Sequence, residues 1–508
     1  MPESYDPLSP LDLEQFDALT AQEGHTIEGQ IKRLGMIEPM IRQRLELNEK
    51  QRRRALSKIH RDERQIDAII KKEFQPVRFE YIKVDGQLAA VIVEKSSLHP
   101  RHRAGYTVMM PNHVDTIVPD WASYDPTQQR AEPDADGRIE SVGVWDEGQA
   151  VANSIAITAD VYVPDDMRLY TVFTRGEEAP QSLGANAVIE QWGGMEEVDM
   201  ILSSEIGPLP TESMPADGDK AMRYIDARPG RARFFTSFEV LDEARGHGSI
   251  HDLPNAQSEY IRFQTWMEEV FSGEDSHGFD YGVDAGGQRL ASLVRSHPIL
   301  GRERIQTGDS WKPWDGRQDP EDYVRALGKD VSYTNVNKTH SKFYAHIVPP
   351  NSVRSTLEKL KAVHAHIGGI RAWAERGIKS KLDVFKGEQS YPPFAMPDRS
   401  RNRAIGIVHD ILTKVAGVEA VRERGQSVAD ENLYADELRQ KLLNNRQFDH
   451  PDDDPFVDSV SAVISIPPVG HHSHSPNEWL SADSMAQVRH AIMRLLRDPD
   501  GLAQLATA

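Results

Sequence analysis

Apolar and polar positions change their period twice along the chain, and these changes divide it into three segments. Up to residue 227, short apolar runs typical of buried strands alternate with stretches at helical spacing, the pattern of an α/β domain. Residues 228–390 follow the order β-α-β-β-α-β, which predicts a compact α+β insert. The α/β pattern resumes in residues 391–508. We therefore predict one α/β domain that is formed by both ends of the chain and interrupted by an inserted domain.

The first segment opens with helices. Residues 11–74 are polar and rich in helix formers, with apolar positions at helical spacing from Ile27 to Ile37, and Pro39 is expected to break the pattern. We expect two or three helices that cover one side of the α/β domain. Residues 77–84 and 88–93 then alternate as strands, and the Asp-Gly pair between them is a strong hairpin signal.

Three further strand patterns end in side chains suited to binding a metal or a proton. These strands span residues 106–110, 168–174 and 198–203, and they lead to His113 and Asp115, to Glu177 and Glu178, and to Glu205. His113 and Asp115 share a face because residues two apart in a strand do so. Open α/β sheets hold their ligands outside the carboxyl ends of the strands, so we expect these side chains on one rim.

Two loops add candidates to this set. Asp146 precedes an Ala-rich helical pattern over residues 149–160, where it is either a helix N-cap or a functional group. Near the end of the chain, a β-rich run over residues 459–466 leads into a loop with His474 and, beside it, His471 and His472. Helices are predicted from 403 to 416 and from residue 482 onward.

The predicted insert has a long unassigned stretch. Its strands are expected at 233–241, 331–336, 342–348 and 381–385, and its helices at 255–271 and 352–366. Residues 272–329 between them are rich in Gly and Asp and contain Trp311 and Trp314. A connection of this length is usually functional or has local structure of its own.

The composition narrows the chemistry. The 508 residues include no cysteine, which excludes disulfides, thiolate nucleophiles and thiolate-bound zinc, so any metal must be held by His, Asp or Glu. The net charge of −20 argues against a nucleic-acid partner. No apolar run approaches the roughly 18 residues of a membrane span, and the N-terminus does not resemble a signal peptide, so we expect a cytoplasmic protein without a membrane partner.

The motifs in order resemble the co-catalytic di-zinc hydrolases that include carboxypeptidase G, aminoacylase-1, succinyl-diaminopimelate desuccinylase and peptidase T. The resemblance covers the chain from about residue 75 onward. It rests on five short motifs, which are His113-x-Asp115-Thr116-x-x-Pro119, Asp146, Glu177-Glu178, Glu205 and His474-x-x-x-Glu478. It implies a zinc-peptidase-like α/β domain with a mixed central sheet flanked by helices, and an α+β insert that serves as a lid and dimerisation domain.

The resemblance also implies a role for each residue. His113 and Glu205 would hold one metal ion, Glu178 and His474 the other, and Asp146 would bridge the two. Asp115 would orient His113, and Glu177 would be the general base that takes a proton from the metal-bridging water. Two divalent ions per subunit are expected, zinc first, with manganese, cobalt or nickel as alternatives.

In these relatives the lid also supplies an active-site histidine, often from the neighbouring subunit of a homodimer. The family spacing is a His followed eight and nine residues later by Asn-Ala, and His247 with Asn255 and Ala256 fits it. We expect His247 to stabilise the oxyanion, in a homodimer formed through the lid.

The chain departs from the family in ways that affect the substrate. Asp146 is followed by Glu147, where relatives usually have Asp or Met. The Gly-Gly-x-Asp that often precedes the last motif is represented only by Asp436, and His346 stands where many relatives have a carboxylate-binding Arg. Without that Arg, and with Trp145, Trp311 and Trp314 as candidate pocket residues, we expect a small amide or amine of aromatic or otherwise specialised structure rather than a general peptide. The alternative is that these tryptophans pack in the core of the lid and that Arg399, Arg401 or Arg403 supplies the missing charge.

The function predicted from these observations is hydrolysis of a C–N bond in a small-molecule substrate. The candidates are, in order, an amidase or deacylase, a dipeptidase or carboxypeptidase, and an aminohydrolase of a specialised amine. A non-catalytic binding protein on the same fold and a single-metal enzyme are the rival classes. Retention of Glu177 and of every ligand argues against the binding protein, which has no need of a base beside the metals.

Overall fold

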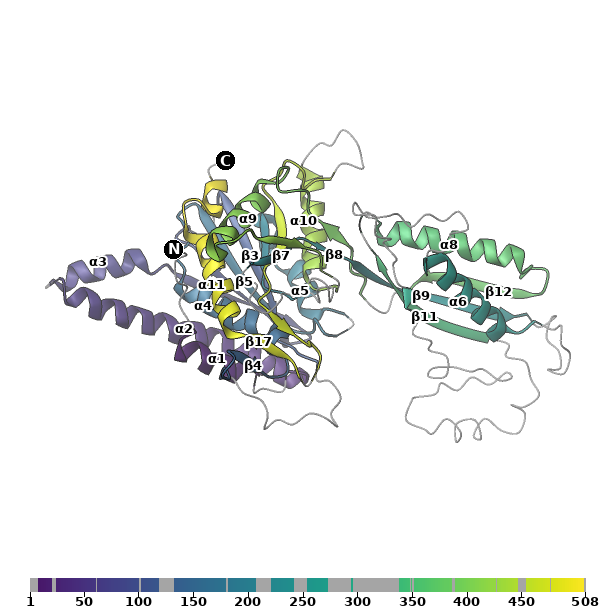
Figure 1. The fold of residues 1–508 in the computed structure, drawn as a ribbon, viewed down its shortest axis with the longest axis horizontal. Helices are drawn as coiled ribbons and strands as arrows, with labels where there is room; N and C mark the ends of the chain where they lie inside the picture. Colours follow the sequence, from purple (N-terminus) through teal and green to yellow (C-terminus); the bar gives the residue numbers. More distant parts are fainter. Residues whose placement is uncertain are drawn as a thin grey trace. The chain divides into compact units, whose positions relative to one another are not determined.

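The computed structural model describes residues 8–20, 24–60, 62–99, 102–117, 132–179, 181–206, 221–241, 254–272, 294–295, 338–347, 349, 351–385, 389–425, 427–445, 454–475 and 477–506. The chain forms two compact units, one of residues 1–228 and 394–508 and the other of residues 229–393. Both ends of the chain therefore contribute to the first unit, and the second is an insertion (Figure 1).

The first unit is built on a mixed eight-stranded sheet with the order β1-β2-β5-β3-β6-β15-β7-β14. The strands are β1 (Val77–Val84), β2 (Gln87–Lys95), β3 (Tyr106–His113), β5 (Met167–Thr174), β6 (Met200–Ser203), β7 (Arg223–Ile225), β14 (Val421–Glu423) and β15 (Ala462–Ser465). The predicted hairpin is β1 and β2, which pair antiparallel. At the centre, β5, β3, β6 and β15 run parallel to one another. The predicted mixed sheet is thus confirmed.

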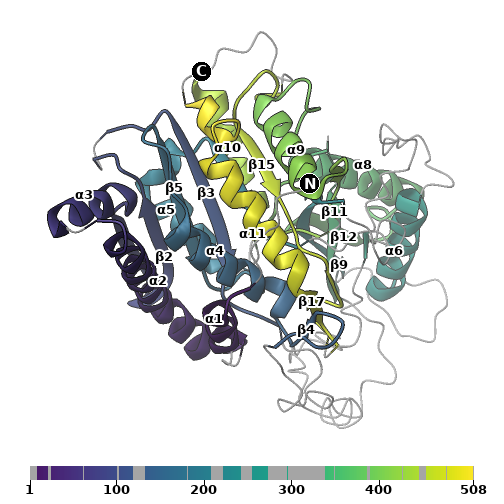
Figure 2. The same cartoon turned by 60° about the vertical axis from the view of Figure 1, so that its left-hand side comes forward.

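Helices cover both faces of this sheet. They are α1 (Pro10–Thr20), α2 (Ile27–Ser57), α3 (Glu63–Glu73), α4 (Gln149–Asp160), α5 (Leu183–Gln191), α9 (Arg403–Ala416), α10 (Glu431–Asn445) and α11 (Ala482–Arg497). Helix α4 connects β3 to β5, and α5 connects β5 to β6 in the opposite direction across the sheet, so right-handed crossovers place the two helices on opposite faces (Figure 2). Helices α1, α2 and α11 contact α4 on one face, and α10 contacts α5 on the other.

Parallel strands at the centre of the sheet position the candidate site. Strands β3, β5 and β6 end at His113, Thr174 and Ser203, so the residues that follow them share one edge of the sheet. The loop before α4 reaches the same edge. The three strands are buried along their whole length, which fixes their register and the direction of the groups at their ends.

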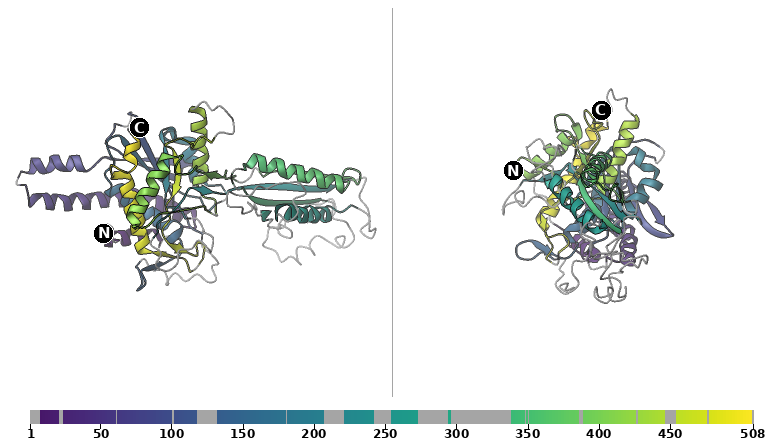
Figure 3. Two further views of the ribbon diagram at one scale, coloured as in Figure 1. Left: turned by 45° about the horizontal axis from the view of Figure 1, so that its top comes forward. Right: turned by 90° about the vertical axis from the view of Figure 1, so that its right-hand side faces the viewer.

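One prediction for this unit was wrong. Pro39 does not end a helix but lies inside α2. The buried stripe of α2 continues through Leu34, Ile37 and Ile41, and its packing outweighs the roughly 3 kcal/mol that an interior proline costs. Beyond this stripe, α2 returns through α3 as a helical hairpin, which is closed by a small apolar cluster of Leu56, Ile66 and Ile70 (Figure 3).

Smaller elements complete the first unit. A three-stranded sheet joins β4 (Arg138–Glu140), β16 (Gly470–His471) and β17 (Trp479–Ser481), and a two-stranded one joins β8 (Ala227–Arg228) and β13 (Phe394–Ala395). Short η-helices span Val144–Gly148, Gly193–Glu197 and Leu502–Leu505. Because β17 pairs with both β4 and β16, the small sheet ties the His474 loop to the chain that precedes Asp146.

The second unit has its own core. Its sheet has the order β10-β11-β9-β12, from β9 (Gly230–Val240), β10 (Val294–Arg295), β11 (Lys338–Ile347) and β12 (Ile378–Val384), with helices α6 (Ala256–Ser272) and α8 (Val353–Ile370). Strand β9 alternates between buried and partly buried residues, as expected for a sheet with one covered face. Phe234 and Phe238 on that face pack against Tyr260 and Phe263 of α6. The predicted strand at 331–336 lies outside the described residues.

No helix within the described ranges is long and apolar enough to cross a membrane.

Candidate metal centre

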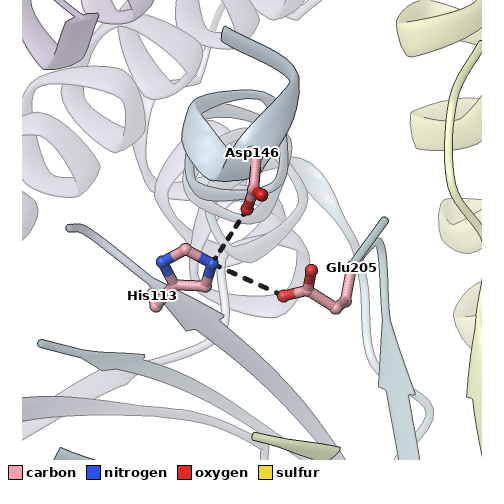
Figure 4. Close-up of side chains that lie close together, drawn as sticks. All are labelled: His113, Asp146 and Glu205. Atoms are coloured by element: carbon pink, nitrogen blue, oxygen red, sulfur yellow. Dashed lines mark ion pairs between the residues drawn. The ribbon is translucent and has the colours of Figure 1, made fainter. Parts of the chain in front are cut away.

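The Nε2 atom of His113 lies near the carboxylates of Asp146 and Glu205 but forms a hydrogen bond with neither. Its Nε2 lies 3.3 Å from Oδ1 of Asp146 and 3.6 Å from Oε2 of Glu205 (Figure 4). The side chain of His113 is 2% exposed, and its Nε2 has no hydrogen-bond partner among the described residues. A buried nitrogen of this kind is costly unless something binds it. The three side chains come from β3, from the loop before α4 and from the end of β6, and they form a group that could hold a metal ion.

A second group of three side chains shares Asp146 with the first. The Nε2 atom of His474 lies 3.0 Å from Oδ2 of Asp146 and 2.9 Å from Oε1 of Glu178. The two oxygens of Asp146 therefore face different histidines, Oδ1 toward His113 and Oδ2 toward His474. The structure thus brings together all five predicted ligands, in two groups that meet at one aspartate.

The charge balance of this site fits two bound cations. Burial lowers the pKa of His474, whereas its hydrogen bonds with Asp146 and Glu178 raise it. The hydrogen bonds have the larger combined effect, and the pKa rises to about 11. Burial raises the pKa of Glu205 well above its ordinary value, and the charge of Glu147 raises it further. Buried carboxyl groups that lie this close together repel one another when ionised, and two imidazoles cannot neutralise all of them. Divalent ions would supply the missing positive charge, and these imidazole and carboxylate donors suit zinc or similar metals.

Glu177 is adjacent to the two groups but belongs to neither. Burial raises its pKa well above the ordinary value, and the charge of Glu178 adds to the effect, whereas His113 lowers it. Glu177 directly precedes the candidate ligand Glu178 in the chain.

Asp115 contacts His113 through its backbone and holds the next loop through its carboxylate. Nδ1 of His113 contacts the backbone oxygen of Asp115 at 3.0 Å, and the Asp115 carboxylate lies farther away, at 3.6 Å. That carboxylate accepts the backbone N–H groups of Gly176 at 2.9 Å and of Glu178 at 3.0 Å. Asp115 therefore fixes the loop that carries Glu177 and Glu178 relative to His113.

Two further buried carboxylates hold the ligand loops by their backbones. Glu478 is 1% exposed and accepts the N–H groups of Gly143, Trp145 and Asp146 at 2.7–3.0 Å. Glu147 is 0% exposed, and its Oε2 accepts the N–H of His113 at 2.6 Å. The Glu147 position, noted in the sequence only as a departure from the family, is thus a structural anchor of the site.

A third anchor lies behind Glu205 and was not predicted. The guanidinium of buried Arg228 donates to the backbone oxygens of Glu205 at 3.2 Å and of Ile206 at 2.9 Å. Its Nε lies 3.6 Å from Glu431, which also accepts hydrogen bonds from Ser203 and Ser465. No local signal marks Arg228 or Glu431, because only the tertiary fold brings them to the end of β6.

Asp430, rather than Asp436, is the acid of this region that reaches the site. Burial raises its pKa to about 7, and it interacts electrostatically with both His113 and Asp115. Its Oδ2 lies 3.5 Å from Oγ1 of Thr174, at the end of β5. The expectation that Asp436 represents the Gly-Gly-x-Asp position has no such contact to support it within the described part of the chain.

The remaining predicted residues are placed less directly. His247, Trp311 and Trp314 lie outside the described residues, as does the side chain of His346. Trp145 packs in the core cluster of the first unit, where it is 6% exposed and donates its indole N–H to the backbone oxygen of Pro468 at 3.1 Å. Its proposed contribution to aromatic substrate binding is therefore wrong. The rings of His471 and His472 contact each other, with centroids 3.9 Å apart.

Comparison with known proteins identifies the fold. The sequence matches no family model and no curated protein. The structure aligns with a tripeptidase from Staphylococcus aureus at a TM-score of 0.55 and 10% identity, over 99% of this chain and 100% of that one. It aligns with an M20 family metallo-carboxypeptidase from Sulfolobus solfataricus at 0.52 and 12%, over 96% and 98%. AtUAH in complex with (S)-hydroxyglycine aligns at 0.51 and 13%, over 99% of each chain.

These likenesses show that the chain has the fold of these solved structures, which include an M20 family metallo-carboxypeptidase. The resemblance predicted from five sequence motifs is thereby confirmed for the fold, while the low identity leaves the activity to be argued from the site.

Proposed function

We propose that this protein is a metal-dependent hydrolase of a C–N bond, of the amidase, deacylase or peptidase type. The observation that carries the proposal is the convergence of five ligand side chains, from separate loops, into two groups that share Asp146. Glu177 beside them argues for catalysis over binding alone, since a protein that only binds metal needs no additional carboxyl there.

In the proposed site, His113 and Glu205 would hold one divalent ion and Glu178 and His474 the other, with Asp146 shared by both groups. When bound, the two ions supply Lewis-acid activation of water and of the scissile carbonyl. Glu177 accepts the proton of the attacking water and returns it to the leaving nitrogen. Positive charge from the ions would lower the pKa of Glu177 from its raised value, which favours the ionised form that accepts a proton.

The anchors make this arrangement rigid. Asp115, Glu147 and Glu478 each accept backbone N–H groups from the loops that carry ligands. Buried carboxyl groups that hold the backbone of the ligand loops preorganise the site. Zinc is the first candidate for both ions, with manganese, cobalt or nickel next.

The experiment compares Glu177→Gln with the wild type. Glu437→Gln, in the middle of α10, is the matched control, because it makes the same chemical change at a residue with no role in the site. Each protein is loaded with zinc, manganese or cobalt and assayed for amine release from N-acyl amino acids, dipeptides and simple amides. The proposal predicts that Glu177→Gln keeps its metal and loses turnover by about 10²-fold or more. Hydrolysis that continues unchanged after exhaustive chelation would overturn it.

The proposal extends to assembly. A homodimer formed through residues 228–390, acting on a small-molecule substrate, remains our expectation, and His247 is the residue expected to complete the site. Sedimentation velocity of the intact protein tests the dimer, and a fully active monomer would contradict it.

A further inference from the structure

A separate cavity opens at the start of α9, in the first unit. Its volume is about 530 Å³, within the usual range for a small-molecule site. Three arginines that alternate along five residues, Arg399, Arg401 and Arg403, line it together with Asp410 and Asp458. None of these residues has a part in the candidate metal centre.

The three arginines are exposed to solvent, and their guanidinium groups make few contacts with other side chains. Arg401 has no side-chain hydrogen bond or ion pair among the described residues, and Arg403 contacts only the neutral amide of Gln504, at 3.4 Å. Arg399 lies 3.6 Å from Glu419, whose side chain is 74% exposed, so the pair is screened by water. Three arginines against two aspartates leave the lining of this cavity with a net positive charge, in a chain of net charge −20.

The walls of the cavity are fixed by the fold. Asn402 is 1% exposed and donates from Nδ2 to the backbone oxygens of Phe456 at 3.0 Å and Ser461 at 2.9 Å. The backbone N–H of Asp458 donates to the backbone oxygen of Arg401 at 2.7 Å. These bonds join the arginine segment to the opposite wall, so the cavity is formed before any ligand arrives.

The N-terminus of α9 does not supply free backbone N–H groups for an anion at this cavity. The side chain of Asn402 already caps the helix by accepting the N–H of Ile405. The three arginine forks therefore carry the recognition, because each can bind a phosphate or carboxylate through two parallel hydrogen bonds. Asp410 and Asp458 offer acceptors for hydroxyl or amino groups on the same ligand.

The cavity lies at the edge of the sheet opposite to the metal centre. Val460 lines it, and the backbone oxygen of Val460 accepts a hydrogen bond from Tyr106, the first residue of β3, at 2.7 Å. His113 is the last residue of the same strand. Seven steps of about 3.3 Å separate the two ends by roughly 23 Å, so one small molecule cannot occupy both sites.

We propose that this cavity binds a small, multiply charged anion that also carries hydroxyl or amino groups, such as a phosphate ester or a polycarboxylate. The arginines bind the charged group, and the two aspartates receive the donor groups. This site is independent of the proposed hydrolase activity.

The test is calorimetric titration of the intact, metal-free protein with pyrophosphate and, separately, with citrate. Saturable binding of at least one probe is expected, and the preferred probe distinguishes a phosphate ligand from a polycarboxylate. The triple variant Arg399→Ala, Arg401→Ala, Arg403→Ala should weaken binding at least about tenfold, and Arg401→Lys should retain part of it.

Two controls separate this site from other sources of binding. A variant with Arg42, Arg354 and Arg497 changed to Ala loses the same charge at exposed positions elsewhere, and it should bind like the wild type. Asp146→Asn alters the metal centre and should also leave binding unchanged. The proposal is overturned if neither probe binds, if the triple variant of the cavity binds as tightly as the wild type, or if Asp146→Asn abolishes binding.

Discussion

The role of Glu478 as an anchor can be tested by Glu478→Gln, which keeps the shape of the side chain but changes its hydrogen bonding. The carboxylate accepts three backbone N–H groups, from Trp145 and Asp146 on Oε1 and from Gly143 on Oε2. The single oxygen of a Gln amide can replace either Oε1, which serves Trp145 and Asp146, or Oε2, which serves Gly143. The NH₂ group then takes the place of the other oxygen, and two donors face each other there. At least one buried N–H group is left without an acceptor, at a cost of about 1–3 kcal/mol.

This cost falls on the loop that positions Asp146, so metal binding should suffer more than the fold as a whole. Loss of a partner that orients metal ligands typically reduces metal affinity by about 10–100-fold. Zinc affinity measured by competition with a chromogenic chelator gives this number directly. Glu259→Gln is the matched control, because Glu259 is another buried glutamate, in the second unit, where it accepts from Arg371, Trp373 and Arg376.

The anchor hypothesis predicts weaker zinc binding for Glu478→Gln and unchanged binding for Glu259→Gln, which should instead destabilise its own unit. If Glu478→Gln binds zinc as tightly as the wild type, Glu478 has only a packing role and the reasoning fails.

Two further predictions concern groups away from the ligands. Arg33 of α2 is 4% exposed and donates to the backbone oxygen of Val114, between His113 and Asp115, at 2.8 Å. Arg33→Met should therefore lower the free energy of unfolding by about 2 kcal/mol and weaken zinc binding. An unchanged urea midpoint and an unchanged zinc affinity would contradict this. Burial in the aromatic core of the second unit lowers the pKa of His364 from 6.5 to about 4, so the unfolded unit binds more protons between these pH values. The contribution of His364 to the free energy of unfolding of that unit should be fully present above pH 6.5. It should fall by up to about 3 kcal/mol as the pH drops toward 4. Amide exchange of α8, corrected for intrinsic rates, should show this loss in the wild type and less of it in His364→Phe.

The sequence predicted elements best where the hydrophobic period decides the structure. The helices at 149–160 and 403–416 are α4 and α9 with the same bounds, and the strands before Glu177 and Glu205 lie within two residues of their predicted starts. Helix α10 was not predicted because its first turn buries two polar residues, Glu431 and Asn432, and so has no apolar stripe there. Tertiary partners, not local propensity, satisfy those groups.

The same distinction separates the ligands from their anchors. The candidate ligands could be recognised from sequence because nearly all are a His or an acid at the end of a strand or the start of a helix, and five such positions in order are unusual. Glu147 and Arg228 could not be recognised, because a carboxylate beside an aspartate or an arginine on a short strand is ordinary on a protein surface. Their burial and their bonds to the backbone of the ligand loops exist only in the folded chain.

The central claim is a two-metal centre that shares Asp146, and the most direct measurement is the number of zinc ions bound per chain. Equilibrium dialysis followed by elemental analysis would compare the wild type with Asp146→Ala and His113→Ala at the same free zinc concentration. The account predicts two ions for the wild type, close to none for Asp146→Ala, because both groups lose a ligand, and one for His113→Ala. A wild-type chain that binds a single ion, or an Asp146→Ala variant that keeps two, would contradict it.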